Sequence, residues 1–263
     1  MKDLSVITVT HQSALFIEDQ VFSVISGALT STIEQIIVDN ASTDGTPELL
    51  DWLVGVKVIK NRENTGFSAA NNQAVKFAKG RYFLFLNPDM RVEEGSLDVL
   101  VEWMDKHPNV GICSCALVDA KGEKMRNPWP FPRWGREVMS LLRLNQLLGE
   151  FQLKEVEVVK GAFLMMRREI VEELGFAFDP RYFLLYEDID LCREVRRRGY
   201  QIAYLDHVKC ADFNSRSFSV KPVKWRYQCY SQAMLTYFRK WTPWYQWMVI
   251  AMLIPVGRWL RRL

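Results

Sequence analysis

The sequence predicts an α/β fold in which helices flank a mostly parallel central sheet. The main observation is that β-rich runs and helix-patterned runs alternate between Leu4 and Leu117, with short loops between them. A second observation is that polar loops follow three of the predicted strands, and such loops gather at the carboxyl edge of a parallel sheet. The hydrophobic share of 49% is high enough to bury such a sheet on both faces.

Short apolar or β-branched runs mark the strands, and polar residues, glycine or proline end them. The expected strands cover residues 4–10, 36–38, 56–59, 83–86, 110–117, 156–166 and 200–205. The expected helices cover residues 15–29, 46–53, 67–78, 97–104, 138–148 and 187–198. Thr46 is expected to cap its helix, with Pro47 at the first helical position. Gly161, inside a strand-like run, predicts the close approach of a ligand or another segment.

Composition limits the class of protein. A net charge of +3 does not indicate a nucleic-acid partner. The five cysteines have no regular spacing, which argues against a disulfide framework and a structural zinc site and predicts reduced thiols. The apolar run at residues 6–9 is too short for a signal peptide, so we expect a cytoplasmic protein.

The stretch from residue 83 to Asp89 organises the chain. Four apolar residues predict a buried strand, which Asn87 and Pro88 end because proline cannot donate to the ladder. Asp89 then follows the carboxyl end of the strand, where ligands bind in open α/β sheets. A carboxylate beside the carbonyl of Asn87 suits a hard divalent cation that bridges phosphate oxygens. Taken alone, however, these residues fit an ordinary turn better.

A second acidic site lies at the start of the helix expected from residue 187. Glu187, Asp188 and Asp190 fall within four positions, and several arginines lie near the helix end. This arrangement complements the helix dipole on any surface helix. Alternatively, crowded carboxylates raise one another's pKa, which suits a general base. Composition alone favours the first interpretation.

Two further segments lie near these sites. Residues 127–132 contain three prolines and Trp129, which predicts a rigid aromatic surface loop. Residues 206–217 are polar, and we expect them to return to the active edge with Asp212 as a candidate ligand.

The end of the chain has a different composition. Four tryptophans interleave with the apolar run 248–254, and three arginines follow: Trp241, Trp244, Trp247, Trp259, Arg258, Arg261 and Arg262. The run is shorter than the ~20 residues that a membrane-spanning helix needs. Tryptophan and arginine favour the membrane–water interface, so we expect an interfacial amphipathic helix. A core helix is the alternative. We expect one domain at residues 1–220, with halves meeting near residue 117, and a helical segment at 221–263.

Four motifs in order resemble those of family 2 glycosyltransferases with the GT-A fold, especially the rhamnosyltransferase-like branch. They are VDNASTDGT at 38–46, NRENTGFSAANN at 61–72, LNPD at 86–89 and EDIDLCR at 187–193. The third resembles the family's DXD metal motif, and the fourth resembles its EDxDLxxR segment. The resemblance extends from residue 4 to about residue 217.

The resemblance implies a role for each matched residue. The expected donor-binding residues are Thr10, His11, Asp39, Asn64, Gly66, Phe67, Asn71 and Asn87. Asp39 would accept a hydrogen bond from a pyrimidine ring, and Asp89 would hold Mg²⁺ or Mn²⁺ against the diphosphate. Asp188 would deprotonate the acceptor hydroxyl, which attacks the anomeric carbon and inverts it. Glu187 and Trp129 would lie on the acceptor side.

Two departures from the family pattern affect the metal site. Asn87 stands at the first position of the DXD motif, and Asp212 stands where many relatives have a metal-binding histidine. Asp212 is therefore the second expected metal ligand. Branch resemblance favours dTDP-L-rhamnose as the donor and leaves UDP-hexoses open. The expected acceptor is a glycan, lipid-linked in a bacterial surface polysaccharide pathway, with the enzyme on the inner face of the cell membrane.

Two other classes of protein were weighed. Nucleotidyltransferases usually carry a glycine-rich, basic loop after the first strand, whereas residues 10–13 here contain neither glycine nor lysine. An inactive partner in glycan assembly is the other alternative. The intact Asp39, Asp89 and Asp188 argue against it.

Overall fold

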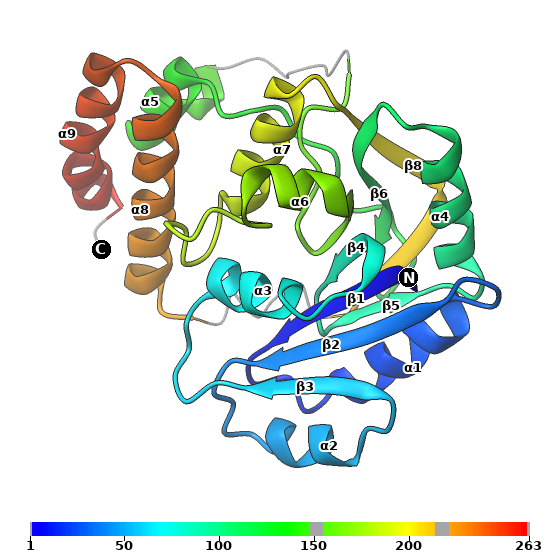
Figure 1. The fold of residues 1–263 in the computed structure, drawn as a ribbon. Coiled ribbons are helices and arrows are strands. Elements are labelled where there is room, and N and C mark those ends of the chain that lie inside the picture. The colour runs from blue at the N-terminus through cyan, green and yellow to red at the C-terminus, as the bar shows by residue number, and fades with distance from the viewer. Residues whose placement is uncertain (1, 148–154, 214–220, 262–263) are drawn as a thin grey trace.

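The computed structural model describes residues 2–147, 155–213 and 221–261. In these ranges, one eight-stranded sheet carries helices on both faces, with the strand order β3-β2-β1-β4-β7-β6-β8-β5 (Figure 1). The strands are β1 Lys2–Thr10, β2 Ile33–Asp39, β3 Val56–Lys60, β4 Gly80–Leu86, β5 Met90–Val92, β6 Val110–Val118, β7 Phe163–Arg167 and β8 Gln201–Asp212. The α-helices are α1 Ile17–Gly27, α2 Thr46–Trp52, α3 Phe67–Val75, α4 Ser96–Lys106, α5 Trp134–Leu141, α6 Arg168–Leu174, α7 Glu187–Arg197, α8 Val223–Trp241 and α9 Trp244–Leu260.

The sheet is mostly parallel, as predicted. Among the described strands, β5 and β7 run opposite to the other six. β7 lies between β4 and β6, and its first residue Phe163 pairs with Leu86, the last residue of β4. This antiparallel insertion brings the residues before β7 to the carboxyl end of β4. The active edge therefore receives segments from both halves of the chain.

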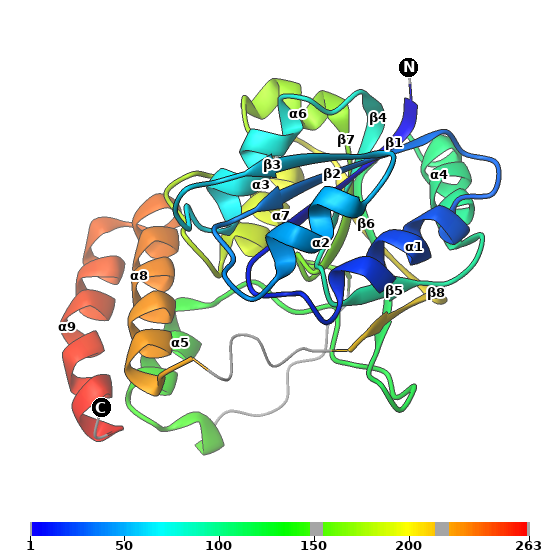
Figure 2. The same ribbon diagram turned by 90° about the horizontal axis from the view of Figure 1, so that it is seen from below.

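Alternating side chains of the strands build two core layers. Leu84 and Leu86 belong to the cluster under α1 and α4, whereas Phe83 and Phe85 belong to the cluster under α3, α6 and α7. Figure 2 shows these two groups of helices on opposite sides of the sheet. Burying one such side chain contributes about 1.5–3 kcal/mol, so the central strand is held firmly from both faces.

Several expected boundaries were wrong. β7 begins only at Phe163, and before it Val158 pairs with Trp129 in an isolated bridge. β8 runs to Asp212 rather than ending at residue 205, because it pairs first with β6 and then with β5. Residues 214–217 of the polar loop expected there lie outside the described ranges.

The start of α2 also differs from the prediction. Gly45 is the N-cap, with a φ of 90° that glycine adopts easily, and Thr46 is already helical. The Thr46 hydroxyl donates to Asp44 at 2.6 Å, and its oxygen accepts the Ser13 N–H at 3.0 Å. The threonine thus joins two loops instead of capping its own helix.

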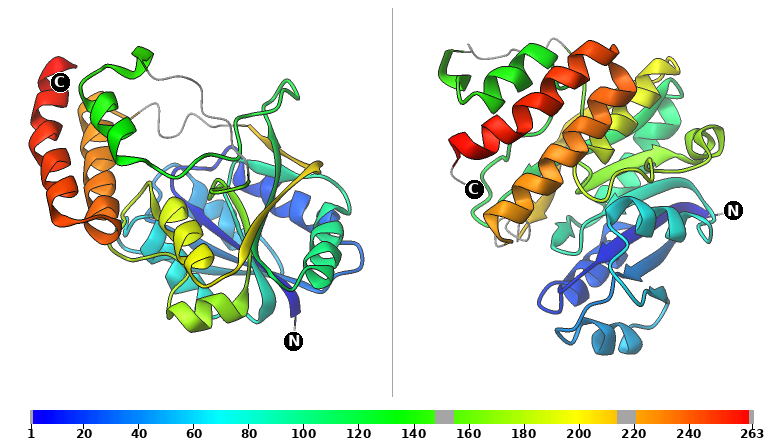
Figure 3. Two further views of the ribbon diagram at one scale, coloured as in Figure 1. Left: turned by 90° about the horizontal axis from the view of Figure 1, so that it is seen from above. Right: turned by 90° about the vertical axis from the view of Figure 1, so that its left-hand side faces the viewer.

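The C-terminal helices α8 and α9 pack against the rest of the protein. α8 and α9 lie side by side with α5 (Figure 3). Their shared cluster includes Tyr237 and Ile250 together with Tyr182 and Tyr186 from the loop before α7. In the described ranges, no helix combines the length and the apolar character that crossing a membrane requires. The inner side of this segment is therefore part of the core.

A buried ionic cluster joins α8 to α7. The Lys240 ammonium lies 2.6 Å from Asp190, 3.0 Å from Glu194 and 3.2 Å from Asp179. The side chains of these three carboxylates are at most 8% exposed. The Trp241 indole N–H also donates to Asp190, at 2.6 Å. Among the described residues, Lys240 is the only ion-pair partner of Asp190, whereas Asp179 also pairs with Arg181, and Glu194 also pairs with Arg197 and Arg198.

We predict that Lys240→Met destabilises the protein by about 3–5 kcal/mol, because it leaves the buried Asp190 carboxylate without its cation. Urea denaturation at pH 7.5 measures the loss. Lys224→Met, at an exposed position of the same helix, is the matched control and should change stability by less than about 0.5 kcal/mol. A similarly small change for Lys240→Met would contradict the proposed contribution of this cluster to stability.

Candidate active site

The first wall of the site is formed by the ends of β1 and β2. Thr10 and Asp39 are the last partners of this parallel ladder. The Asp39 carboxylate is 2% exposed and accepts the Ser42 N–H at 3.3 and 3.4 Å. His11 donates from Nδ1 to the Asn40 carbonyl at 3.0 Å. These bonds fix the Asp39 carboxylate at the carboxyl edge of the sheet, and its contact with a base stays a prediction.

Asn40 organises the neighbouring loop, and the sequence analysis did not single it out. Its Oδ1 accepts from Asn61 Nδ2 and from the N–H and hydroxyl of Thr65, each at 3.1 Å. Its Nδ2 donates to Asn64 Oδ1 at 3.0 Å and to the Gly66 carbonyl at 3.2 Å. The only available signal was its position directly after Asp39. The Asn64 side chain is used here to hold the loop.

The 61–72 segment is tied to the loop before α7. Gly66 has a φ of +85°, and a Cβ there would lie 2.6 Å from Phe183. The next residue, Phe67, donates its N–H to the Phe183 carbonyl at 2.7 Å and packs edge-on against Phe178. Asn71 is buried and donates to the Phe67 carbonyl at 2.9 Å. The structure gives these residues packing roles, and their donor-binding roles stay predictions.

The expected metal ligands come together through strand pairing. After β4, Met90 donates its N–H to the Asn87 carbonyl at 3.3 Å, which closes the turn that carries Asp89. Met90 then pairs with Asp212 across β5 and β8, so the two carboxylates become neighbours. Asp89 and Asp212 are 8% and 6% exposed. Burial, followed by the charge of Asp212, raises the pKa of Asp89 to about 6.

These two carboxylates fit a divalent cation. Asp212 Oδ1 is buried and has no hydrogen-bond partner among the described residues, so one hard ligand oxygen is uncommitted. Mg²⁺ is commonly held by one or two carboxylates together with substrate phosphates and water. The described residues contain no group of three or more His, Cys, Asp or Glu side chains placed to hold a metal. Phosphate oxygens and water would therefore complete the coordination.

Asp188 occupies a tight position beside Gly161. Its Oδ2 accepts the Gly161 N–H at 2.9 Å, and its Oδ1 accepts the Ile189 N–H at 2.8 Å. A Cβ at Gly161 would lie 3.2 Å from Asp188 Cβ, which confirms the close approach predicted at this glycine. The segment also joins the two acidic sites, because Asn87 donates its N–H to the Ala162 carbonyl at 3.0 Å.

The surroundings of Glu187 and Asp188 affect the pKa of the two carboxyl groups differently. Burial raises the pKa of Asp188, and its two N–H donors partly offset this effect. Burial, and then the charge of Asp188, raise the pKa of Glu187 well above its usual value. Glu187 Oε2 is buried without a partner among the described residues. Burial therefore favours the protonated form of Glu187, whereas the two N–H donors favour the ionised form of Asp188.

The start of α7 is held by α8. Leu185 and Tyr186, directly before α7, have φ values of 72° and 67°, which are unfavourable for residues with a Cβ. The Tyr186 hydroxyl lies 3.2 Å from that of Tyr230, and its ring packs on Tyr237. Contacts from α8 thus maintain the backbone conformation from which Glu187 and Asp188 extend.

Trp129 lies at the edge of the site, in the segment expected to be rigid. It exchanges backbone hydrogen bonds with Val158 at 3.0 and 3.1 Å. Nearby, Asn127 Oδ1 accepts the Lys160 N–H at 3.2 Å. The aromatic segment therefore supports residues 158–160, and its contact with an acceptor stays a prediction.

Residues 5–175 match the family described as glycosyl transferase family 2. The chain belongs to that family. It is 28% identical over 209 residues to the low-salt glycan biosynthesis hexosyltransferase Agl10 of Haloferax volcanii, covering 77% of this chain and 64% of that protein. It is 24% identical over 250 residues to an N-acetylglucosaminyl-diphospho-decaprenol L-rhamnosyltransferase of Mycobacterium tuberculosis, covering 83% and 78%.

Solved structures support the fold. The mannosyltransferase PcManGT from Pyrobaculum calidifontis, in complex with GDP-Man and Mn²⁺, aligns with a TM-score of 0.65 and 20% identity. The alignment covers 98% of this glycosyltransferase and 73% of PcManGT. The GT-A fold is therefore confirmed.

We predict that Asp89→Asn stabilises the metal-free enzyme at pH 7.5. The folded pKa of Asp89, about 6, lies above the ordinary pKa of 3.8. Ionisation of Asp89 therefore opposes folding increasingly between these two pH values and fully above them. The gain should be about 2–3 kcal/mol at pH 7.5 and should vanish near pH 3.5.

Urea denaturation in EDTA at both pH values measures this difference. Asp206→Asn, at an exposed position of β8, is the control and should change stability by less than about 0.5 kcal/mol. If Asp89→Asn were less stable than the wild type at pH 7.5, the carboxylate would already be compensated in the folded protein.

Proposed function

We propose that this chain is an inverting glycosyltransferase that moves a sugar from a nucleoside diphosphate donor to a hydroxyl of a glycan acceptor. One observation carries the proposal. Residues 161–162 contact Asp188 on one side and the Asn87–Asp89 turn on the other, and this shared segment supports a base and a diphosphate site that lie side by side. Transfer to a hydroxyl needs these two groups on either side of the anomeric carbon.

Asp188 is the proposed general base. As the acceptor oxygen bonds to the anomeric carbon, the bond from that carbon to the diphosphate breaks, and the hydroxyl proton passes to the carboxylate. The backbone donors at Gly161 and Ile189 fix the carboxylate before the reaction, so little reorganisation is needed. Glu187 is proposed to lie on the acceptor side.

The donor is bound at both ends in this proposal. Asp39 accepts from the pyrimidine ring, while Asp89 and Asp212 face the diphosphate. A divalent cation held there, Mg²⁺ or Mn²⁺, would stabilise the negative charge on the departing nucleoside diphosphate. Asp89 and Asp212 suit such an ion, because their carboxylate oxygens are hard ligands and both side chains are buried.

We favour L-rhamnose from dTDP-L-rhamnose as the donor sugar. The sequence motifs resemble the rhamnosyltransferase-like branch, and the mycobacterial relative is named a rhamnosyltransferase acting on a diphospho-decaprenol glycan. The archaeal relative, named a hexosyltransferase, supports a UDP-hexose as the alternative. A lipid-linked glycan of a bacterial surface polysaccharide is the proposed acceptor.

A thermal-shift screen tests the donor assignment, because a ligand that binds the native state raises its melting temperature. The screen compares dTDP-L-rhamnose, UDP-glucose, UDP-N-acetylglucosamine and GDP-mannose, each with Mn²⁺ and with EDTA. A shift for dTDP-L-rhamnose alone supports the favoured donor. The absence of any shift would overturn the proposed function.

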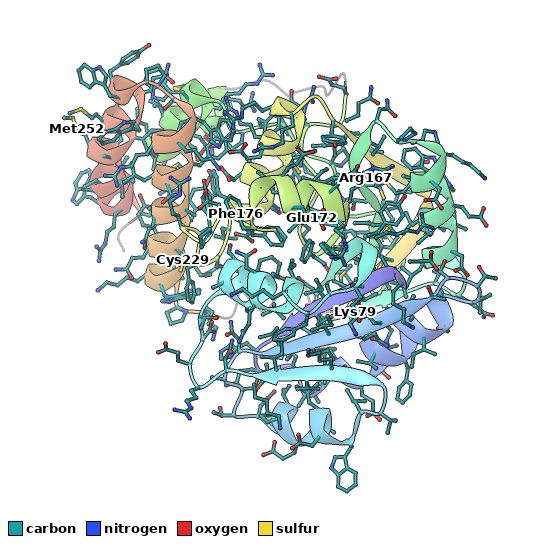
Figure 4. The ribbon with its side chains drawn as sticks, viewed as in Figure 1. Lys79, Arg167, Glu172, Phe176, Cys229 and Met252 are labelled. Atoms are coloured by element: carbon teal, nitrogen blue, oxygen red, sulfur yellow. The ribbon has the colours of Figure 1, made fainter. Side chains whose placement is uncertain are left out.

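We further propose that the enzyme lies on the cytoplasmic face of the membrane through the outer face of α9. Tyr245, Met252, Val256 and Trp259 are exposed, and their spacing of seven, four and three places them on one helix face. Met252 points away from the body of the molecule in Figure 4. A continuous apolar face flanked by aromatic residues suits the interface of a bilayer.

The arginines at the end of the chain contribute less than the sequence analysis expected. The Arg261 guanidinium donates to the Ser140 carbonyl at 2.9 Å and the Gly257 carbonyl at 3.0 Å. Arg261 therefore links α9 to α5, and its N–H donors are only partly available to lipid headgroups. Arg262 lies outside the described residues. Membrane binding is proposed to rest mainly on apolar contact.

We predict that Asp188→Asn retains donor binding and loses transfer by about 10²–10⁴-fold, since an amide cannot accept the proton. Transfer is measured with the donor found in the screen, and binding is measured by calorimetry. Asp206→Asn, at a 72% exposed position of β8, is the control. If Asp188→Asn instead abolished donor and Mn²⁺ binding, Asp188 would be a ligand and not the base.

We predict that the double variant Met252→Ser, Trp259→Ser binds anionic liposomes at least about tenfold more weakly than the wild type. Each buried apolar side chain contributes about 1.5–3 kcal/mol, and both positions are exposed in the protein. Vesicle flotation measures the binding, and melting curves check the fold. Trp52→Ser, at an 83% exposed position of α2, is the control. Equal flotation of all three proteins would contradict a membrane role for α9.

A further inference from the structure

Lys160 places a positive charge among the acids of the active site. Its ammonium lies 3.5 Å from Asp212 Oδ2. The same charge lowers the pKa of Asp89 and of Asp188, against the larger effect of burial. The Lys160 side chain is 31% exposed, whereas that of Asp212 is only 4% exposed. One accessible cation thus acts on all three carboxylates.

The side chain of Lys160 is not needed to maintain its own turn. The backbone N–H donates to Asn127 Oδ1 at 3.2 Å, and the carbonyl accepts the Phe163 N–H at 3.2 Å. These two bonds hold the segment that carries Gly161. The ammonium is therefore available for a ligand, and removing it need not disturb the backbone that positions Asp188.

The contact with Asp212 is loose. Charge-assisted N–H···O bonds are usually about 2.7–2.9 Å long, so a separation of 3.5 Å leaves the ammonium weakly held. Lysine carries its charge on a flexible stem with three donors, which can turn to another acceptor. A second anion entering the site can therefore draw the ammonium away from Asp212.

An incoming diphosphate is such an anion. It brings negative charge toward Asp89, Asp188 and Asp212, and repulsion would oppose its binding unless cations intervene. A divalent ion bound at Asp89 and Asp212 would repel the nearby ammonium and remove its counter-ion. The phosphate oxygens are then the partners that the displaced ammonium can reach from the same side.

We propose that Lys160 is a ligand of the donor's diphosphate. Before the donor binds, the Lys160 ammonium is the counter-ion of Asp212. When a divalent cation binds Asp89 and Asp212, the ammonium moves to a phosphate oxygen. The proposal rests on the proposed function, because it assigns one more contact to the same donor. It also implies that Lys160 competes with the cation in the donor-free enzyme. Its removal should therefore have opposite effects on the two ligands.

The test uses Lys160→Met, which keeps the length of the stem, and Lys160→Arg, which keeps the charge. Lys209→Met, at an exposed position of β8 three residues before Asp212, is the matched control. Calorimetry measures Mn²⁺ alone, and then UDP, dTDP and inorganic pyrophosphate in the presence of Mn²⁺. Melting curves verify that each variant is folded.

Lys160→Met should bind Mn²⁺ alone at least about threefold more tightly, because the competing ammonium is gone. It should bind the diphosphates about tenfold more weakly, which corresponds to about 1.4 kcal/mol for one charge-assisted hydrogen bond. Lys160→Arg should recover most of the diphosphate affinity, and Lys209→Met should match the wild type in both measurements.

Unchanged diphosphate affinity in Lys160→Met would overturn the proposal, as would weaker Mn²⁺ binding. Pyrophosphate separates this failure from that of the proposed function. If the wild type bound pyrophosphate but neither nucleotide, the donor assignment would fail while the loss in Lys160→Met would still support the lysine contact. If the wild type bound none of the three, the lysine contact would be overturned as well.

Discussion

The balance of charge among buried carboxylates is the constraint on which the rest of this structure depends. Asp89, Asp188 and Asp212 are brought together at the carboxyl edge of the sheet, where little water remains to solvate them. A buried charge costs several kcal/mol unless it is paired or hydrogen-bonded. Here Lys160 and two backbone N–H groups provide only part of that compensation. The remaining negative potential is what a divalent cation can use.

A second group of acids, on the same helix as Asp188, is paired with positive charge. Asp190 and Glu194 lie one helical turn apart and face Lys240 of α8, whereas Asp188 lies two positions earlier and faces Gly161. Residues two apart on a helix point in different directions, and residues four apart share a face. The acids of α7 therefore have two functions. Asp188 belongs to a site with little positive charge, whereas Asp190 and Glu194 belong to the ionic cluster that fixes α8 to α7.

This division connects the C-terminal helices to the chemistry. α8 contacts Tyr186, whose unfavourable φ sets the direction in which α7 begins, and α7 carries Asp188 in its first turn. α9 covers the other side of α8 and turns a second apolar face outward. The surface proposed to meet the membrane is thus two helices away from the proposed base, through a packed and ion-paired core.

Local pattern was enough to determine the fold class and most strand and helix positions, and the four motifs together then selected Asp89 and Asp188 as the acids to consider. Strand β4 is buried on both faces and therefore appears in the sequence as a continuous apolar run. A polar residue after such a strand marks the carboxyl edge of the sheet wherever the strand pairs. Motif spacing then led to the family. These features depend on residues close together in the sequence, so the sequence carries them directly.

Tertiary structure alone decided which distant segments meet. The pairing of β5 with β8 places Asp212 beside Asp89, and the antiparallel insertion of β7 brings Lys160 and Gly161 to the site. It also showed that α9 has a core face as well as an exposed apolar face, so the core interpretation is confirmed for one face and the membrane interpretation stays a prediction. An apolar stripe in a sequence shows that a face avoids water, but only the folded chain determines what covers it.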